Sequence, residues 1–352
     1  MSTIILTGGG TAGHCSPHVA LLPHLTKHFD NIYYIGSENG IEREILAKTN
    51  IPYYYTSCAK LKRNKFFSNI TIPFKLIKGI NEAKKLIKSL KPDVIFSKGG
   101  FVSVPTVIAG HKLGIPIIAH ESDYTIGLAN KITSKYCLKV LTAFPETAKS
   151  LSNGEYVGMP LKPINSNINK AKIYQQFGFT GKRPVLLVTG GSLGAKAIND
   201  AVRNSLDTLL NVYDVLHICG KNNLDKKINK IGYYQVEFLS NILDAYSITS
   251  ICVMRAGAST LFEVMNNKIP AVLIPLPKGA SRGDQILNAK YFNALGLANI
   301  LYQENLSPSS LVVAVNSAYS NRFELQKNFE KNNVKSANEK IVNILTKFAL
   351  KS

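Results

Sequence analysis

Short apolar runs alternate with longer amphipathic segments along most of the chain. The short runs predict strands, and segments such as Ile80–Leu90 and Ser259–Asn266 have the length and spacing of helices. Within these runs, polar residues do not alternate with apolar ones. Both faces of each strand should therefore be buried, which is typical of parallel sheets covered by helices on both sides. Strands are expected at Ile4–Leu6, Ile32–Ile35, Val94–Phe96, Pro116–Ala119, Val140–Ala143, Val185–Val188, Val215–Ile218, Ile251–Met254 and Ala271–Ile274.

This pattern restarts once along the chain. A strand enters a glycine turn at Thr3–Gly10 and again at Pro184–Gly194, and the Gly-, Pro- and Asn-rich stretch 156–167 between them predicts an interdomain linker. We therefore expect two doubly wound domains facing each other across a cleft, with ligands at the carboxyl ends of the strands. The expected boundaries are residues 1–157 for the first domain, 158–163 for the linker and 164–330 for the second domain. The amphipathic segment from about Arg322 to Leu350 predicts helix, of which residues 331–352 can pack back on the first domain.

Composition narrows the class of protein. The 352 residues include no apolar run of the roughly 18–20 residues that a membrane-spanning helix needs. The N-terminus lacks the basic region and cleavage site of a signal peptide, so we expect a cytoplasmic protein. Five scattered cysteines without a CxxC or Cys/His cluster favour reduced thiols over disulfides or zinc. A net charge of +20 favours an anionic partner, and the absence of zinc-finger, RNP or heptad signatures argues against nucleic acid.

Three glycine-rich turns follow predicted strands, at residues 8–14, 98–103 and 190–195. Glycines let the backbone approach a diphosphate, and the helix that follows presents unpaired N–H groups to it. The first turn also fits the GxGxxG dinucleotide fingerprint, but the acid expected about 20 residues later has no candidate before Glu38. A tight turn that binds nothing is the alternative for any one of them. Three turns split between two domains favour two diphosphate-bearing ligands.

The motifs GGGTAGH, SKGGFVSVP, HES, GGSLGA, RAGASTLFEV and DQILNA carry a resemblance to a known family. In this order and approximate spacing, from about Ile4 to Ala294, they resemble the MurG family, which transfers N-acetylglucosamine from UDP-N-acetylglucosamine to lipid I and makes lipid II. The resemblance implies a GT-B fold of two Rossmann-like domains, an inverting mechanism, and no cofactor or active-site metal. The sequence has no Asp-x-Asp pair of the kind that metal-dependent transferases use.

The resemblance also implies partners and a location. The partners are UDP-N-acetylglucosamine, undecaprenyl-linked lipid I and an anionic membrane surface, with cell-wall synthesis and division proteins as further candidates and no nucleic acid. The location is the cytoplasmic face of the bacterial inner membrane, as a peripheral protein.

The donor is implied to bind mainly the C-terminal domain. By resemblance, Glu263 would accept hydrogen bonds from the ribose diol, with a merely helix-stabilising carboxylate as the alternative. Gln285 would bind sugar hydroxyls. Phe238 and the backbone of Leu239 would flank the uracil, with core packing as the alternative. The donor-site candidates are Thr11, Ala12, Gly13, Lys162, Ser192, Leu193, Gly194, Phe238, Leu239, Ala258, Ser259, Thr260, Glu263, Asp284 and Gln285.

The acceptor diphosphate is implied to bind the N-terminal glycine turns. Its candidates are Gly9, Gly10, Gly13, Gly99, Gly100, Phe101, Ser103 and Asp123. His14 begins a predicted helix, whose positive end disfavours imidazolium, so His14 can be the neutral general base; a capping or ligand-orienting histidine is the alternative. His120 and Glu121 are the other catalytic candidates, and Asp123 also competes for the base role.

The chain departs from the family pattern at a few positions. Ser122-Asp123 replaces the common Gln-Asn after His-Glu, and Phe101 replaces a Tyr. Met159-Pro160-Leu161-Lys162 replaces Asn-Pro-x-Arg, and a lysine offers a point charge where an arginine offers a planar fork. These changes bear on the fine geometry of the acceptor site and on turnover.

Residues 60–91 combine ten Lys or Arg and one acid, Glu82, with interleaved aromatic and aliphatic residues. This combination favours an anionic bilayer surface; a solvated helix over an ordinary core is the alternative. The membrane candidates are Lys62, Arg63, Lys65, Phe66, Phe67, Ile70 and Phe74.

Other functions stay open from the sequence. A transferase acting on another lipid, such as diacylglycerol, would share the fold. A Rossmann-type NAD-binding oxidoreductase would leave Glu263 and Gln285 without a role. A catalytically weak scaffold at a membrane complex is suggested only by the departures around Asp123 and Lys162.

Overall fold

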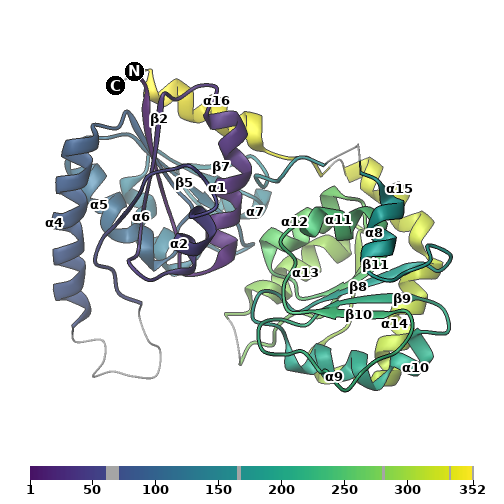
Figure 1. Cartoon of the computed structure of the whole chain (residues 1–352). Coiled ribbons are helices and arrows are strands. Elements are labelled where there is room, and N and C mark those ends of the chain that lie inside the picture. The colour runs from purple at the N-terminus through teal and green to yellow at the C-terminus, as the bar shows by residue number, and fades with distance from the viewer. Residues whose placement is uncertain (61–70, 165–167, 280–281, 333, 351–352) are drawn as a thin grey trace. The chain divides into compact units, whose positions relative to one another are not determined.

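The computed structural model describes residues 1–60, 71–164, 168–279, 282–332 and 334–350, and the chain divides into two compact units (Figure 1). The first unit is Met1–Lys162 with Lys335–Ser352, and the second is Pro163–Val334. Each unit has its own parallel sheet and its own core.

The described part of the first unit contains a seven-stranded parallel sheet with the order β3-β2-β1-β4-β5-β6-β7. Its strands are β1 (Thr3–Thr7), β2 (Asn31–Gly36), β3 (Tyr53–Tyr55), β4 (Val94–Ser97), β5 (Ile117–Glu121), β6 (Lys139–Thr142) and β7 (Gly154–Tyr156). The five predicted strands are confirmed. The edge strands β3 and β7 were not predicted, because they are partly exposed and lack an apolar run.

Helices cover both faces of this sheet. Ile4 and Leu6 of β1 pack with α1 and α16 on one face, and Ile5 packs with α4 and α5 on the other. Figure 1 shows the yellow helix α16 beside the purple α1. The helices are α1 (Ala12–Leu25), α2 (Ile41–Leu46), α4 (Ile72–Leu90), α5 (Val104–Lys112), α6 (Leu128–Thr133), α7 (Pro145–Lys149) and α16 (Asn338–Ala349), with short 3-10 turns η1 (Phe101–Ser103) and η2 (Ser134–Tyr136).

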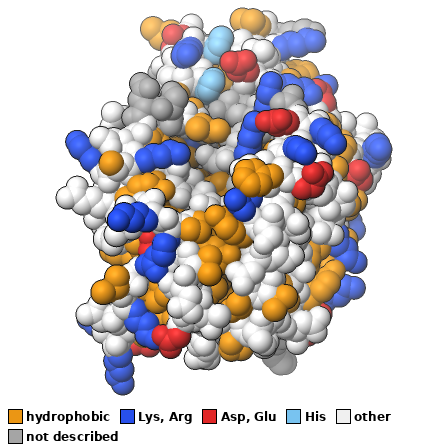
Figure 2. Space-filling view, turned by 90° about the vertical axis from the view of Figure 1, so that its right-hand side faces the viewer, with side chains coloured by type: hydrophobic (Ala, Val, Ile, Leu, Met, Phe, Trp, Pro, Cys, Tyr) orange, Lys and Arg blue, Asp and Glu red, His pale blue; other side chains and the backbone are white. Residues whose placement is uncertain are grey.

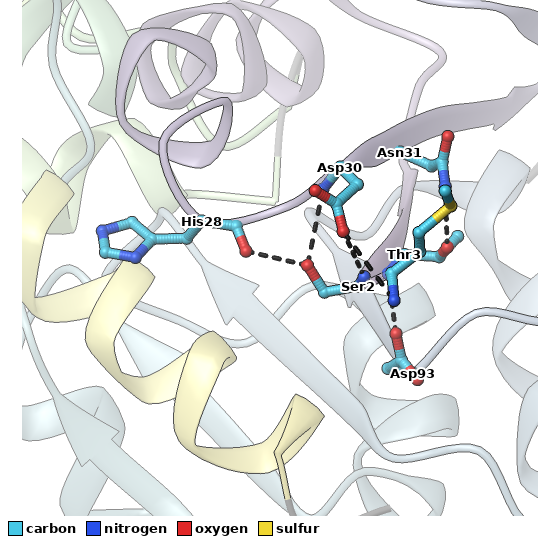
Figure 3. Close-up of polar contacts among 7 residues, drawn as sticks. Ser2, Thr3, His28, Asp30, Asn31 and Asp93 are labelled. Atoms are coloured by element: carbon cyan, nitrogen blue, oxygen red, sulfur yellow. Dashed lines mark hydrogen bonds and ion pairs between the residues drawn. The ribbon is translucent and has the colours of Figure 1, made fainter.

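Polar contacts fix the amino end of β1 between its neighbours (Figure 3). The N–H of Ser2 donates to Asp30 Oδ2 at 2.7 Å, and the N–H of Thr3 donates to Asp93 Oδ2 at 2.6 Å. The Ser2 hydroxyl donates to the carbonyl of His28 at 2.9 Å. These contacts lie at the opposite end of β1 from the glycine turn, so they set the strand register without taking part in the site.

The described part of the second unit contains a six-stranded parallel sheet with the order β10-β9-β8-β11-β12-β13. Its strands are β8 (Val185–Thr189), β9 (Asp214–Ile218), β10 (Tyr233–Val236), β11 (Thr249–Met254), β12 (Ala271–Leu273) and β13 (Ala298–Ile300). The four predicted strands are confirmed, and β10 and β13 were missed at the edges. The helices are α8 (Lys170–Gln176), α9 (Lys196–Asn204), α10 (Leu206–Leu209), α11 (Ile242–Ile248), α12 (Ala258–Asn266), α13 (Asp284–Ala294), α14 (Pro308–Ser320) and α15 (Arg322–Asn332), with the 3-10 turn η3 (Gln303–Asn305).

The strand order of each sheet reverses beside its first strand, between β1 and β4 in the first unit and between β8 and β11 in the second. In open parallel sheets, ligands bind at the carboxyl ends of the strands at such a reversal. The chain leaves β1, β4 and β8 through the three glycine turns, and leaves β11 through residues 255–257. The fold therefore positions one candidate site on each unit.

The segment predicted as a linker is partly built into the first unit. Met159 and Leu161 are buried, and the N–H and carbonyl of Leu161 bond the side-chain amide of Asn338 at 3.0 and 2.8 Å. The amphipathic segment 322–350 is also not one helix. It forms α15 in the second unit and α16 in the first, because Phe329 packs in one unit while Ile341 packs under the sheet of the other.

Basic side chains are spread widely over the face shown in Figure 2, more widely than acidic ones, as the net charge of +20 requires. Within the described residues, no helix has both the length and the apolar composition that crossing a bilayer demands.

Candidate active site

A pocket of about 430 Å³ lies in the second unit, at the carboxyl ends of β8 and β11. It brings together five residues predicted for the donor site, and its lining is Thr189, Gly190, Gly191, Ser192, Leu193, Gly194, Ala195, Met254, Arg255, Gly257, Thr260, Leu276 and Gln285. Ala258, Ser259, Glu263 and Asp284 lie on the adjoining helices without lining it.

The glycine turn after β8 is closely packed. Gly191 and Gly194 have φ values of 89° and 74°, which glycine adopts far more readily than other residues. A Cβ on Gly194 would lie 2.1 Å from the carbonyl oxygen of Cys219, so no other residue fits there. The turn leaves Ser192 and Leu193 exposed at its tip, and its three glycines line the pocket.

Two helices begin at this pocket. α9 starts after Ala195 and α12 after Gly257, and neither of these N-cap residues makes a side-chain hydrogen bond to its helix. The positive ends of both helix dipoles and their first-turn N–H groups therefore favour an anion in the pocket. A nucleotide diphosphate has the matching charge and acceptor oxygens.

The carboxylate of Glu263 is held by a buried phenol. Tyr246, on α11, donates its hydroxyl hydrogen to Glu263 Oε2 at 3.2 Å and is 3% exposed. Burial, with the nearby charge of Glu263, raises the pKa of Tyr246 well above its usual value, so it stays a donor. Sequence reasoning missed Tyr246, because only the fold brings this residue of α11 to Glu263 on α12.

Contacts of α13 support the other side of the pocket. Gln285 accepts the N–H of Leu276 on its Oε1 at 3.0 Å, and buried Asn288 donates to the carbonyl of Ala256 at 3.0 Å. Asp284, predicted to contact the donor, lies 3.6 Å from Arg282 in an ion pair. Arg255, which sequence reasoning did not single out, donates to the carbonyl of Ile274 at 3.0 Å and so fixes the loop that precedes α13.

The predicted uracil contacts lie after β10, outside the pocket lining. Phe238 is 63% exposed, so the core-packing alternative for this side chain is wrong. Leu239 is half-buried.

The first two glycine turns contact each other in the first unit. A Cβ on Gly100 would lie 2.2 Å from the carbonyl oxygen of Gly9, and a Cβ on Gly10 would lie 2.6 Å from Phe101 Cε1. Gly99 packs against the side chain of Asn130. The structure thus brings Gly9, Gly10, Gly99, Gly100 and Phe101 to one place, as expected for adjacent strands β1 and β4. The buried hydroxyl of Ser103 donates to the carbonyl of Gly100 at 3.0 Å and supports the turn from behind.

His14 stands in the first turn of α1, beside these glycines. Its Nδ1 lies 3.0 Å from the carbonyl oxygen of Lys98. A carbonyl only accepts hydrogen bonds, so this contact assigns the hydrogen to Nδ1 and leaves the lone pair of the neutral ring on Nε2. Nε2 is therefore the atom that can accept a proton from a substrate.

His120 and Glu121 are engaged in holding the protein together. Buried His120 has Nδ1 at 2.5 Å from Lys98 Nζ and Nε2 at 2.8 Å from the carbonyl oxygen of Gly158, and burial lowers its pKa well below the usual value. The carboxylate of Glu121 accepts the N–H groups of Ser122, Asp123 and Gly127 at 2.9, 3.1 and 2.8 Å, and the amide of Asn130 at 2.9 Å. These contacts shape the loop after β5 and leave His14 as the better candidate for the base.

Glu42 is a site residue that no motif indicated. It is fully buried, and its carboxylate accepts the N–H of Gly10 at 3.1 Å and the N–H of Ser37 at 3.1 Å. It therefore fixes the first glycine turn from below and uses the N–H of Gly10, so an acceptor diphosphate would rely on other groups of the two turns.

The remaining predicted residues lie in the first unit or outside the described residues. Thr11, Ala12, Gly13 and Lys162, predicted as donor contacts, belong to the first unit. Phe74 lies on α4 and is 74% exposed. The other membrane candidates, Lys62, Arg63, Lys65, Phe66, Phe67 and Ile70, lie outside the described residues. Within the described ranges, no group of three or more His, Cys, Asp or Glu side chains is arranged to hold a metal ion.

Comparison with known proteins identifies both units. Residues 4–142 match the glycosyltransferase family 28 N-terminal domain, and residues 185–344 match the family 28 C-terminal domain. A protein of Clostridium botulinum named UDP-N-acetylglucosamine--N-acetylmuramyl-(pentapeptide) pyrophosphoryl-undecaprenol N-acetylglucosamine transferase is 44% identical over 352 residues, with 99% of each chain covered. A Bacillus cereus protein of the same name, numbered 2, is 45% identical over 97% of this chain and 98% of its own.

Solved structures share the fold. The crystal structure of Acinetobacter baumannii MurG superposes with a TM-score of 0.76 at 27% identity, covering 99% of this chain and 100% of that one. The UDP-GlcNAc 2-epimerase of Neisseria meningitidis superposes with a TM-score of 0.65 at 13% identity, covering 100% of both chains, which shows a likeness of fold alone.

Proposed function

The chain belongs to the MurG family of glycosyltransferase family 28, and we infer that it is a hexosyltransferase that moves N-acetylglucosamine from UDP-N-acetylglucosamine to lipid I, giving lipid II for peptidoglycan synthesis. The observation that carries this conclusion is the 44% identity to the Clostridium botulinum enzyme over 99% of both chains. Its two parallel-sheet units form the GT-B type of glycosyltransferase fold.

The pocket of the second unit is the proposed donor site. The glycine turn after β8 and the start of α12 supply backbone N–H groups for the UDP diphosphate, and Gln285 offers its amide N–H groups to sugar hydroxyls because its carbonyl oxygen is used by Leu276. Glu263, oriented by Tyr246, accepts the ribose hydroxyls. Exposed Phe238 is available to stack on the uracil.

The two contacting glycine turns of the first unit are the proposed site for the acceptor diphosphate, with His14 as the general base. The 4-hydroxyl oxygen of N-acetylmuramic acid attacks C1 of the donor sugar while its proton passes to His14 Nε2. The bond between C1 and the UDP oxygen breaks, and UDP leaves with the bonding electrons, so the anomeric configuration inverts. The helix starts around the donor diphosphate stabilise the negative charge that develops on UDP.

A transfer assay tests this function. The purified chain is incubated with labelled UDP-N-acetylglucosamine and either a short-chain lipid I analogue or diacylglycerol, and the products are identified by mass. Transfer to the lipid I analogue is expected. Transfer to diacylglycerol alone would contradict the proposal.

Two variants test the roles in the same assay. His14→Ala should lower kcat by roughly 100-fold or more with little change in the donor KM, the usual size of a general-base effect. Glu263→Ala should raise the donor KM at least about tenfold, as expected for a lost charge-assisted hydrogen bond. Glu324→Ala, at an exposed position of the same unit, is the control. Unchanged donor affinity in Glu263→Ala would remove it from the donor site.

We propose peripheral contact with the cytoplasmic face of the plasma membrane through α4. Its exposed face carries Phe74 and Ile77, which are 74% and 59% exposed, beside Lys75 and Lys78. Exposed apolar side chains flanked by lysines suit an anionic bilayer. Attraction to the anionic lipid headgroups contributes about 1 kcal/mol of binding free energy per basic residue. Contact with cell-wall synthesis and division proteins stays an expectation from the family.

Vesicle flotation tests the membrane surface. Replacing Phe74 and Ile77 with Ser should reduce binding to phosphatidylglycerol vesicles several-fold, whereas Val313→Ser, an exposed valine on α14 of the second unit, should not. Equal binding by all three proteins would contradict this assignment.

A further inference from the structure

Lys98 follows β4 as the first residue of the second glycine turn, and its side chain is fully buried. Its Nζ donates to Ser122 Oγ at 2.7 Å and contacts His120 Nδ1 at 2.5 Å. Both partners are uncharged, and no carboxylate of the described residues pairs with it. A buried amine without an ion-pair partner is costly, so a lysine is an unexpected choice for this position.

One arrangement of hydrogens satisfies the whole cluster. His120 Nε2 donates to the carbonyl of Gly158 at 2.8 Å, so Nδ1 carries the lone pair and accepts from Lys98. The Lys98 side chain thereby ties the end of β4 to β5, to the loop at Ser122 and to the segment after β7. It also accounts for Ser122, where the family commonly has a Gln, because the serine hydroxyl accepts from this lysine.

The backbone of Lys98 belongs to the proposed acceptor half of the site. Its carbonyl oxygen accepts from His14 Nδ1 at 3.0 Å and so assigns the tautomer of that ring. Gly99 and Gly100, the next two residues, form the turn proposed to bind the acceptor diphosphate. Anchoring the side chain therefore fixes the peptide that orients the base.

The charge of Lys98 responds to what binds at this turn. Burial lowers its pKa to about 7, against a smaller opposite effect of the negative charges of Glu121 and Asp123. The other titratable groups facing it are His120 on β5 and His14 and His18 on α1. A diphosphate on the adjacent turns adds negative charge, which raises the pKa of the amine.

We propose that Lys98 is a positioning residue of the acceptor half, which fixes His14 and the second glycine turn and takes up a proton when a diphosphate binds there. This rests on the proposed acceptor site. Above about pH 7, the bound diphosphate then increases the fraction of Lys98 that carries a positive charge.

Calorimetric titration tests the proton uptake. A short-chain lipid I analogue is titrated into the full chain at about pH 8, where an amine of pKa about 7 is mostly neutral, in two buffers of different ionisation enthalpy. We expect wild type to take up roughly half a proton or more on binding, His14→Ala to retain this uptake, and Lys98→Met to lose it. Lys112→Met, an exposed lysine on α5, is the control.

Steady-state kinetics provide the second measurement. Lys98→Met should raise the acceptor KM roughly tenfold or more while the donor KM stays unchanged, and adding Ser122→Ala should have little further effect because the two side chains act as a pair. Thermal unfolding of the variant, followed by circular dichroism, shows whether its first unit is folded, because Lys98 lies in that unit and UDP is proposed to bind the other.

Two results separate the inference from the function. Proton uptake retained in Lys98→Met, or a parallel rise of both KM values, would overturn the role of Lys98. A wild-type chain that neither binds the analogue nor transfers sugar to it would overturn the proposed function itself.

Discussion

Tyr246 shows how much of the proposed site depends on single hydrogen bonds. Its phenol and the carboxylate of Glu263 are paired across two helices, and the ring is buried. This hydrogen bond orients the carboxylate of Glu263. Lys98 acts in the same way on His14, through a carbonyl that dictates which ring nitrogen carries the hydrogen.

Tyr246→Phe should raise the donor KM by about three- to tenfold and leave the acceptor KM unchanged. The loss is limited because one hydrogen bond to a charged group, worth about 1.5–3 kcal/mol, only orients the carboxylate. The matched control is Tyr213→Phe, which removes a 2.9 Å hydrogen bond to Asn316 in the same unit. If both variants bind UDP as wild type does, Tyr246 has no part in donor binding.

Lys98 should also leave a signature in the pH dependence of stability. Its pKa is about 7 in the folded chain and has an ordinary value of 10.5 in the unfolded chain, so between these pH values the unfolded state binds more protons. The stability of wild type relative to Lys98→Met should therefore increase as the pH rises from about 7 to about 10. Urea unfolding of both proteins across this range measures it, and a constant difference would contradict a buried, neutralisable amine.

Among the elements, the glycine turns impose the strictest requirements. Gly100 has a φ of 78°, and any Cβ there would lie 2.2 Å from the backbone of Gly9, so the two turns approach each other only because both are glycine-rich. The motifs indicated the turns from the sequence. Their mutual contact follows from the adjacency of β1 and β4, which the sequence pattern does not encode locally.

Gly100→Ala should reduce sugar transfer by roughly 100-fold or more and destabilise the first unit by more than the 1–2 kcal/mol of left-handed backbone strain alone. Gly114→Ala is the matched control, since its φ is 74° and no atom lies within 4 Å of the added Cβ. Gly114→Ala should be destabilised by the backbone strain alone and should transfer sugar at the wild-type rate. Equal effects of the two substitutions would mean that the contact between the turns is unimportant.

For the molecule as a whole, the two units have separate cores, and the C-terminal helix belongs to the first. Ile341, Val342 and Leu345 of α16 are buried with Ile4 and Leu6 of β1. The last helix therefore completes a core that the first residues of the chain begin. Its removal would expose the part of that face that α1 does not cover.

Ile341→Ala should destabilise the first unit by about 2–5 kcal/mol, the usual cost of such a cavity. In differential scanning calorimetry with UDP, the transition of the first unit should move down while the UDP-stabilised transition stays in place. Leu311 is buried in the core of the second unit. Leu311→Ala should therefore lower the UDP-stabilised transition and leave that of the first unit in place. A single transition shifted equally by both variants would show that the units unfold together.

The sequence alone determined the parallel α/β class, nine central strands and the glycine turns, because continuous apolar runs and glycine clusters are local signals. It did not indicate the edge strands β3, β7, β10 and β13, whose partly exposed residues lack such a run. Only the tertiary structure showed what Lys98, Tyr246 and Glu42 contact at the sites, since each acts through a partner from another element of the fold. It also decided that residues 322–350 are divided between two cores, because burial depends on which surface a helix meets and not on its own periodicity.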